Sequence, residues 1–130
     1  MPYIPPQLRY TQEHEWVSLE EDGTATIGIT DFAQSELGDI VYVELPQEGD
    51  ELTQMESFGT IEAVKTVSDL YAPVSGEILA VNQQLVDAPT LINESPYDDG
   101  WLVKVKLSDP GELEKLLSAE QYGEQVGQED

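Results

Sequence analysis

The stretch that decides the fold is Ser57-Phe58-Gly59-Thr60-Ile61-Glu62-Ala63-Val64-Lys65-Thr66-Val67-Ser68-Asp69-Leu70-Tyr71-Ala72-Pro73. Residues with a preference for strands lie on both sides of Lys65, and neither Gly nor Pro interrupts the chain between Gly59 and Pro73. The Asn-Gly or Asp-Gly pair of the commonest hairpins is missing, but a type I turn accepts most residues. We therefore interpret the segment as two strands with a tight reversal near Lys65.

Three other segments alternate apolar and polar residues with the period of a strand, which predicts one buried and one mostly wet face. They are Thr24–Ile29, Ile40–Leu45 and Trp101–Leu107. In the second segment the alternation sets Val41, Val43 and Leu45 on one face, against Ile40, Tyr42 and Glu44 on the other. Many short strands at close spacing predict a mainly β protein, a flattened antiparallel barrel or sandwich of two small sheets.

Two helices are predicted beside the strands. Thr30 is a good N-cap for a short helix over residues 31–37, which would stop at Gly38. Near the C-terminus, a cap at residues 108–109 followed by Pro110 predicts a second helix with a stripe of leucines. Its leucines are Leu113, Leu116 and Leu117. The length predicts a single domain over residues 1–130, with an N-terminal arm at 1–8 and an acidic, frayed tail at 123–130.

Composition excludes several classes of function. The 130 residues include 27 Asp or Glu, five Lys or Arg, one His and no Cys, which gives a net charge of −22. The chain therefore has no disulfide, thiol nucleophile, zinc–thiolate site or multi-histidine metal site. A charge of this sign argues against nucleic acid and anionic membranes as partners, and it favours partners with basic surfaces. Solubility alone explains the charge equally well. No apolar run approaches the roughly 20 residues that span a bilayer.

Lys65 is the residue most suited to chemistry. The other three lysines, Lys104, Lys106 and Lys115, fall on a wet strand face and in the predicted C-terminal helix, whereas Lys65 has no cation near it in the sequence. A lone lysine at a hairpin tip suits the amide attachment of a carrier group, because its stem gives reach and its deprotonated amine is a nucleophile. From the residues alone, an ordinary solvated turn lysine is the simpler interpretation.

The sequence around Lys65 resembles the lipoyl-attachment hairpin of the H protein family of the glycine cleavage system. That family carries a pattern like Gly-x-x-Glu-(Ser/Ala)-Val-Lys-(Ala/Thr)-x-Ser-Asp. The matching positions here are Gly59, Glu62, Ala63, Val64, Lys65, Thr66, Ser68 and Asp69. The segment Pro73-Val74-Ser75-Gly76-Glu77 is similar to the turn that follows in the family.

Further motifs extend the resemblance over residues 8 to 122. They are His14-Glu15-Trp16-Val17, Thr26-Ile27-Gly28-Ile29-Thr30-Asp31, Gly38-Asp39-Ile40-Val41, Val43-Glu44-Leu45-Pro46, Leu91-Ile92-Asn93, Ser95-Pro96-Tyr97 and Gly100-Trp101. Several ordered motifs at matching spacing are far more specific than one lysine in a turn. The resemblance implies a barrel-sandwich hybrid, the fold of lipoyl and biotinyl carrier domains.

The resemblance also implies a carrier rather than an enzyme. Lipoate would be attached as an amide to Lys65, after loading by a lipoyl or octanoyl transferase or by a lipoate ligase. The arm would take the aminomethyl group of glycine from a pyridoxal-phosphate-dependent glycine decarboxylase to a tetrahydrofolate-dependent aminomethyltransferase, and dihydrolipoamide dehydrogenase would reoxidise it. We expect a monomer. No transit peptide is visible, which fits a protein of the bacterial cytoplasm.

The same resemblance suggests roles for three acidic residues. Glu62 and Asp69 belong to the attachment-hairpin motif, and Glu15 would lie in a cleft that shelters the loaded arm, where a carboxylate would hold a cationic amine. Some family members carry a His in the segment after Thr-Asp, whereas residues 32–36 here have none. For the neighbouring residues we expect plain roles: His14 as a satisfied strand-edge residue, and Trp16 and Trp101 as core anchors.

Other functions stay open at this stage. A lipoyl or octanoyl relay protein that donates to other lipoyl enzymes would carry the same lysine. A biotin carrier fits less well, because its lysine usually lies between methionines and Lys65 lies between Val64 and Thr66. An acidic interaction domain that is never acylated is a further alternative. An enzyme is disfavoured, since the sequence offers no nucleophile–base pair.

Overall fold

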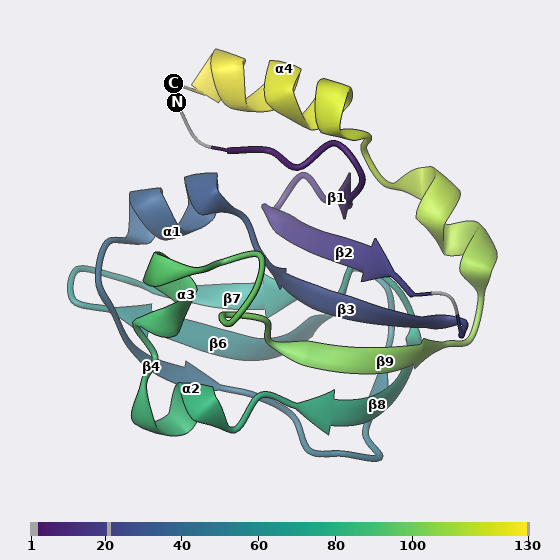
Figure 1. Cartoon of the computed structure of the whole chain (residues 1–130), viewed down its shortest axis with the longest axis horizontal. Coiled ribbons are helices and arrows are strands. Elements are labelled where there is room, and N and C mark those ends of the chain that lie inside the picture. Colours follow the sequence, from purple (N-terminus) through teal and green to yellow (C-terminus); the bar gives the residue numbers. More distant parts are fainter. Residues whose placement is uncertain (1–2, 21, 130) are drawn as a thin grey trace.

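Two antiparallel sheets pack face to face in the computed structural model, which describes residues 3–20 and 22–129 (Figure 1). The larger sheet has the order β1-β2-β3-β9-β8-β5 and the smaller has the order β4-β6-β7. The strands of the larger sheet are β1 (Arg9–Tyr10), β2 (Glu15–Leu19), β3 (Thr24–Ile29), β9 (Val103–Leu107), β8 (Gly76–Val81) and β5 (Glu51–Leu52). Those of the smaller sheet are β4 (Ile40–Glu44), β6 (Ser57–Ala63) and β7 (Val67–Tyr71). The prediction of a mainly β, flattened antiparallel sandwich is confirmed.

The main core lies between the two sheets. Alternating residues of β3 and β9 point into it, among them Ile27, Val103 and Val105, which are completely buried. Ile61 of β6 and Leu70 of β7 enter it from the smaller sheet. Because successive side chains of a strand point to opposite faces, the burial of Ile61 and Leu70 turns Glu62 and Asp69 outward.

The predicted alternation in β4 is wrong at Ile40 and Val41, since Ile40 shares the buried face with Val43 and Val41 does not. The register between β4 and β6 shifts between Ile40 and Tyr42, so Val41 is an extra residue in the strand. Ile40 and Val43 are buried, whereas Val41 is 50% exposed. A bulge of this kind interrupts the period of two, so a residue count alone puts Val41 on the wrong face.

The first predicted helix is confirmed as α1 (Asp31–Leu37). The Thr30 hydroxyl accepts a hydrogen bond from the Ala33 N–H at 3.2 Å, and Gly38 ends the helix with a φ of 79°. Two further short helices, α2 (Gln84–Asp87) and α3 (Leu91–Glu94), follow β8. Each buries one apolar side chain, Leu85 and Ile92.

The predicted C-terminal helix is divided in two. A 3-10 helix, η1 (Pro110–Lys115), begins at the Asp109 cap, and the chain is extended at Leu116. The backbone of Leu117 pairs with Tyr10 through hydrogen bonds of 2.7 and 2.9 Å, which prevents a continuous helix. The leucine stripe is therefore split, with Leu116 in the main core and Leu117 against a second cluster.

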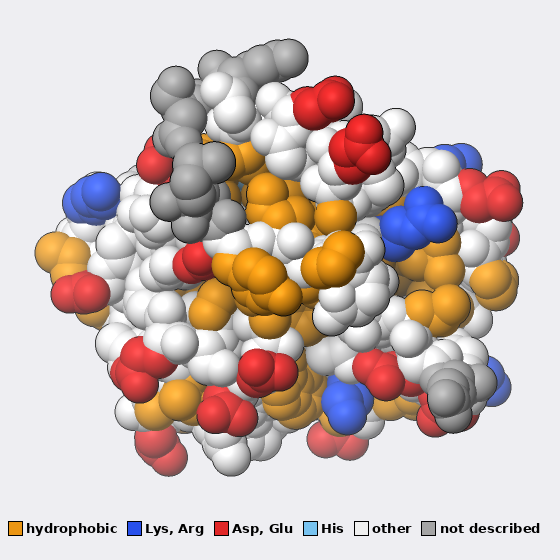
Figure 2. Space-filling model, turned by 45° about the horizontal axis from the view of Figure 1, so that its top comes forward, with side chains coloured by type: hydrophobic (Ala, Val, Ile, Leu, Met, Phe, Trp, Pro, Cys, Tyr) orange, Lys and Arg blue, Asp and Glu red, His pale blue; other side chains and the backbone are white. Residues whose placement is uncertain are grey.

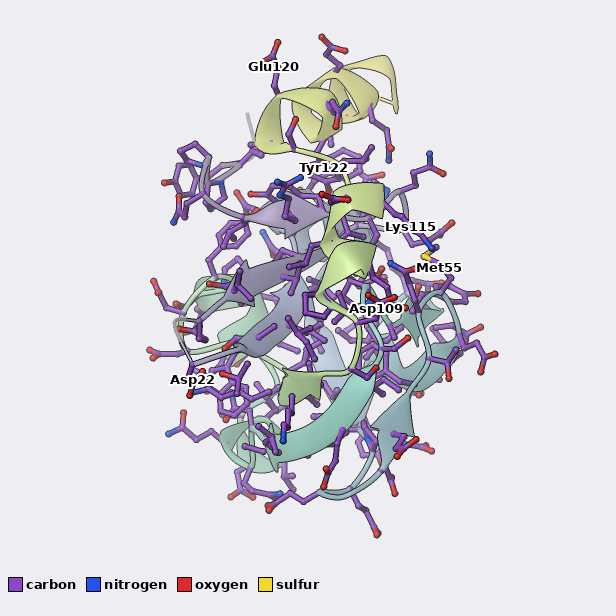
Figure 3. All side chains as sticks on the ribbon, turned by 90° about the vertical axis from the view of Figure 1, so that its right-hand side faces the viewer. Asp22, Met55, Asp109, Lys115, Glu120 and Tyr122 are labelled. Atoms are coloured by element: carbon purple, nitrogen blue, oxygen red, sulfur yellow. The ribbon has the colours of Figure 1, made fainter. Side chains whose placement is uncertain are left out.

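The prediction of a frayed tail at 123–130 is wrong for residues 123–129. These residues belong to α4 (Ala119–Glu129), which is held by the buried side chains of Tyr122 and Val126, spaced one helical turn apart. Tyr122 points from α4 toward the sheet, while Glu120 points outward (Figure 3). The ring of Tyr122 stacks on that of Tyr10 with a centroid distance of 4.7 Å. Residue 130 lies outside the described residues.

The N-terminal arm packs on the surface of the protein over residues 3–8. Tyr3 donates its N–H to Asp31 and accepts a hydrogen bond from the Tyr97 hydroxyl, at 2.9 and 2.7 Å. Leu8 is buried in the cluster that contains Tyr10 and Tyr122. Residues 1–2 of the predicted arm lie outside the described residues. Within the described ranges, no helix has the length and apolar character needed to cross a membrane.

Gly28 of β3 makes room for the indole of Trp16. A Cβ at this position would lie 2.5 Å from two carbons of the indole, so Gly28→Ala forces the ring to move. We expect a loss of about 1–3 kcal/mol of unfolding free energy, measured by denaturant titration.

Gly127→Ala in α4 serves as the matched control. Nothing lies within 4 Å of its Cβ position, so this change should stabilise by about 0.5–1 kcal/mol through helix propensity. Equal effects of the two substitutions would contradict the assigned packing of Trp16.

Candidate functional site

Lys65 lies in the turn between β6 and β7, as the sequence predicts. Residues 64–66 are exposed, and the Ala63 N–H donates to the Thr66 carbonyl at 2.8 Å. The turn projects beyond the end of the smaller sheet, on the side of α1 (Figure 1). The amine of Lys65 is therefore available to a partner while its backbone is held by two paired strands.

The segment after α1 holds the turn in place. The Val64 N–H donates to the Asp39 carbonyl at 3.1 Å, which ties the turn to the start of β4. A Cβ on Gly38 would lie 3.5 Å from Lys65 Cε, so the lysine stem runs directly beside this glycine. The segment Gly38–Asp39 therefore contacts both the backbone of the turn and the Lys65 side chain.

Asn93 of α3 fixes that segment in turn. Its amide nitrogen donates to the Gly38 carbonyl at 2.8 Å and to Gln34 Oε1 at 3.0 Å. Its amide oxygen accepts from the Ile40 N–H at 3.0 Å. One half-buried side chain therefore links the end of α1, the start of β4 and, through Asp39, the turn that carries Lys65.

Glu62 and Asp69 lie on the outer face of the smaller sheet. Glu62 is opposite Val67, and Asp69 is opposite Thr60, two residues farther from the turn. Both carboxylates are exposed. The structure therefore brings these two predicted residues onto one face of the sheet, next to the turn that carries Lys65.

Glu15 lies elsewhere and is only 1% exposed. Its carboxyl accepts hydrogen bonds from the Thr11 hydroxyl at 2.6 Å and from the Tyr71 N–H at 3.2 Å, so it joins β2 to the end of β7. Burial raises its pKa from 4.5 to about 8, against the opposing effect of the hydrogen bonds from Thr11 and Tyr71. The sheltering role of Glu15 stays a prediction, and because the carboxyl is buried, a group could reach it only if the side chains that cover it moved.

His14 and Trp16 have the plain roles expected of them, whereas Trp101 packs at the edge of the core rather than inside it. His14, directly before β2, contacts the Tyr122 hydroxyl through Nδ1 at 2.8 Å. Trp16 is buried and donates its indole N–H to the Pro96 carbonyl at 3.0 Å. Trp101 is half-buried against the hydrophobic cluster that contains Trp16. The Lys104 ammonium lies 5.5 Å from the centroid of the Trp101 ring.

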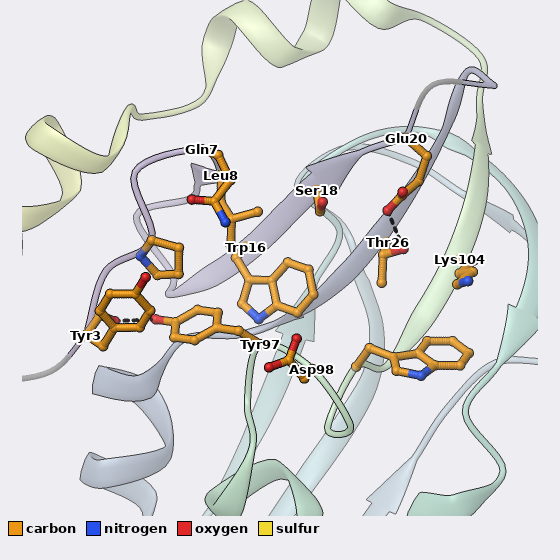
Figure 4. A pocket seen from close by; sticks show the side chains of 12 residues that line it. Tyr3, Gln7, Leu8, Trp16, Ser18, Glu20, Thr26, Tyr97, Asp98 and Lys104 are labelled. Carbon is orange, nitrogen blue, oxygen red and sulfur yellow. Dashed lines mark hydrogen bonds between the residues drawn. The ribbon is translucent and has the colours of Figure 1, made fainter.

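A separate hollow of about 470 Å³ lies on the outer side of the larger sheet (Figure 4). It is bordered by the N-terminal arm, by Trp16 and by the loop that contains Tyr97. None of its lining residues belongs to residues 57–73. Carboxylates are spread over the visible face in Figure 2, around a group of hydrophobic side chains. The hollow is thus a different surface from the one that presents Lys65.

The described residues contain no evident metal-binding site. Among the side chains described in residues 3–20 and 22–127, no three His, Cys, Asp or Glu side chains are grouped so that they could hold a metal ion. The groups that the hairpin does present are the exposed amine of Lys65 and the exposed carboxylates of Glu62 and Asp69.

Comparison with known proteins agrees with this geometry. The family described as "Glycine cleavage H-protein" matches residues 8–129. The chain belongs to this family. It is 57% identical over 125 residues to the glycine cleavage system H protein of Staphylococcus carnosus, covering 96% of this chain and 98% of that one. The corresponding protein of Bacillus cytotoxicus is 60% identical over 126 residues, covering 97% and 98%.

A solved structure gives the same result for the fold. The crystal structure of a glycine cleavage system H protein from Mycobacterium marinum superposes with a TM-score of 0.89 at 43% identity, covering 95% of this chain and 99% of that one. The H-protein family match spans the hairpin, Glu15 and Asn93 together. The resemblance inferred from the motifs is thereby confirmed.

Three residues of the site were not identified from the sequence. Thr11 precedes the His-Glu-Trp motif, and its side chain hydroxyl also accepts from the backbone N–H groups of Glu13 and Glu15. Gly38 was assigned as a helix stop and, like Asn93, as part of a motif, with no contact to the lysine turn predicted for either residue. Periodicity carries no signal for such contacts, because they join segments that are far apart in the sequence.

The buried carboxyl of Glu15 makes stability depend on pH. It stays protonated in the folded protein up to about pH 8 but ionises above about 4.5 when unfolded, so the folded state binds more protons between these values. The free energy of unfolding should therefore fall as pH rises through this window, by up to about 1.4 kcal/mol per pH unit.

The measurement is urea unfolding at a series of pH values, for the wild type and for Glu15→Gln. The amide cannot ionise, so the variant should lose most of this slope. Parallel curves for the two proteins would contradict a raised pKa of Glu15.

Asn93→Asp tests the link to the lysine turn. The carboxylate can still accept from the Ile40 N–H but cannot donate to the Gly38 carbonyl or to Gln34, so about 1–3 kcal/mol of stability should be lost. Thermal and denaturant unfolding would measure the loss. Gln83→Glu makes the same amide-to-acid change at an exposed position and should stay within about 0.5 kcal/mol.

Proposed function

We propose that this chain is the lipoyl carrier of the glycine cleavage system, a single non-enzymatic carrier domain with lipoate attached to Lys65. It would take the aminomethyl group of glycine from the pyridoxal-phosphate-dependent decarboxylase to the tetrahydrofolate-dependent aminomethyltransferase, and dihydrolipoamide dehydrogenase would restore the disulfide. The observation that carries the proposal is the exposed Lys65 at the end of the β6–β7 hairpin in a chain of this family.

The residues around Lys65 fit the attachment of an acyl group. The amine is exposed, so an enzyme can approach it, and the strands on either side are anchored by Ile61 and Leu70 in the core. When Lys65 acts as nucleophile, its neutral amine attacks an activated carboxyl group, the leaving group departs, and the nitrogen gives up a proton as the amide forms. A rigid scaffold presents the same geometry to every enzyme that acts on it.

The attached group would supply the redox chemistry that the chain lacks. Lipoate contributes a disulfide that can be opened and closed, whereas the protein itself contains no Cys. The amide would also remove the charge of Lys65, leaving the carboxylates of the surrounding face.

For Glu15 we propose a holding role that depends on its ionisation. A cation brought to this carboxyl would favour the ionised form and lower the pKa from its present value of about 8. The Tyr71 N–H and the Thr11 hydroxyl already stabilise that form by donating to the carboxyl oxygens. We also propose a cytoplasmic location, since the relatives compared above are bacterial.

The proposal is tested by intact mass and peptide mapping after incubation with a lipoate ligase, lipoate and ATP. Lys65 should gain one lipoyl group, and Lys65→Arg should gain none. Lys104→Arg is the matched control and should be loaded like the wild type. Loading of another lysine, or no loading by a ligase that modifies a known acceptor, would overturn the assignment.

Reconstitution tests the role of the loaded protein. The loaded wild type should support the release of carbon dioxide from glycine when the other three components of the system are added, and unloaded protein should not. A loaded protein that fails here, yet donates its acyl group to other lipoyl enzymes, would support the relay function instead.

A further inference from the structure

Exposed apolar side chains gather around Lys65. Val41, Tyr42, Val64 and Val67 are 50%, 54%, 76% and 61% exposed. All four lie on the smaller sheet or in the turn that carries Lys65. Large apolar side chains that stay partly exposed are ordinary when they are scattered over a surface, but a group of them marks an interaction surface.

The strand register places Tyr42 and Val67 on one face, with Val41 next to Tyr42 in β4 and Val64 in the adjoining turn. Tyr42 of β4 lies opposite Glu62 of β6, and Glu62 lies opposite Val67 of β7, so the three form a row across the sheet. The row of Glu44, Thr60 and Asp69 is two residues farther from the turn on the same side. We call the surface made by Val41, Tyr42, Glu44, Glu62, Val64, Val67 and Asp69 the hairpin face.

The hairpin face combines an apolar centre with a carboxylate border. Glu44, Glu62 and Asp69 are exposed, and Lys65 is the cation of the turn. A partner that fits this surface has an apolar patch bordered by Lys or Arg side chains, because opposite charges steer association and fix the register of an interface. An acidic partner would be repelled.

The enzyme that forms the amide on Lys65 has the strictest need for this surface. The lysine stem has only four methylene groups, so the catalytic site of that enzyme must come close to the turn. Enzymes that act on the far end of a long attached arm need not cover the same residues. The inference rests on the proposed function, since it presupposes that Lys65 is acylated.

We propose that the hairpin face is the docking surface of the enzyme that loads Lys65, and that the side chains of Tyr42 and Val67 provide its main apolar contacts. They flank the strand that leads to the lysine and lie in one row of the sheet. Their burial against the enzyme supplies binding, and the neighbouring carboxylates set the orientation.

The test uses the full chain with Tyr42→Thr and Val67→Thr combined. Both side chains are more than half exposed, and Thr retains a preference for strands, so the fold should persist, as checked by circular dichroism and thermal unfolding. With a lipoate ligase, lipoate and ATP, KM for the carrier should rise at least tenfold while kcat changes less than twofold.

The matched control combines Leu19→Thr and Leu79→Thr. These residues are 58% and 41% exposed and belong to the larger sheet, so the substitutions remove similar apolar surface elsewhere. The control should be loaded with the wild-type KM. Equal KM values for the two double variants would overturn the proposal, whereas failure of the wild type to be loaded at all would overturn the proposed function.

A chemical reaction separates the loss of docking from a change in the reactivity of the Lys65 amine. Acetylation of Lys65 by a small acetylating reagent, followed by peptide mapping, should proceed equally in the wild type and in both variants, because this reagent needs no docking surface. A slower reaction only in the Tyr42/Val67 variant would assign the effect to the lysine itself and overturn the proposal.

Sedimentation would detect the alternative occupant, a second copy of the chain. If the wild type dimerises, the Tyr42/Val67 variant does not, and loading is unchanged, the hairpin face is a self-association surface and the docking proposal is wrong.

A partner with a basic border also predicts that KM of the wild type rises with ionic strength, and that Glu44→Gln with Asp69→Asn weakens this dependence.

Discussion

The burial of one face of each sheet against the other determines where the functional side chains point. Ile61 and Leu70 are almost completely buried, so their neighbours in β6 and β7 face solvent. The hairpin cannot slip by one residue without exposing its core residues and burying Glu62 and Asp69. Presentation of Lys65 at the end of the sheet is a consequence of this packing.

Support for the lysine turn comes from outside the hairpin. Asn93 holds Gly38 and Ile40, and the Asp39 carbonyl accepts from Val64. A turn supported in this way loses little conformational freedom when an enzyme binds it, which reduces the entropic cost of docking. In the proposed carrier, the mobile element would be the arm attached to Lys65, presented from a turn that the rest of the protein holds in place.

The described acidic side chains differ in burial: most lie at the surface, whereas Glu15 is buried. Exposed carboxylates keep the net charge strongly negative, so basic surfaces attract the protein and acidic ones repel it. Glu15 differs, because burial favours its neutral form while two hydrogen-bond donors are already aimed at its oxygens. The same side chain connects the two sheets through Tyr71, so its protonation state affects both the stability of the fold and the end of the lysine hairpin.

The sequence by itself determined the segments of β3, β4 and β9, the α1 cap and stop, and the hairpin around Lys65, because these depend on local alternation, turn chemistry and capping. The attachment motif likewise identified the family from neighbouring residues. Only the tertiary structure decided that Val41 lies on a bulge, that residues 123–129 form a helix held by Tyr122 and Val126, and that Glu15 is buried. It also revealed the contacts of Asn93. These features depend on segments distant in the sequence, whose pairing and burial no local pattern encodes.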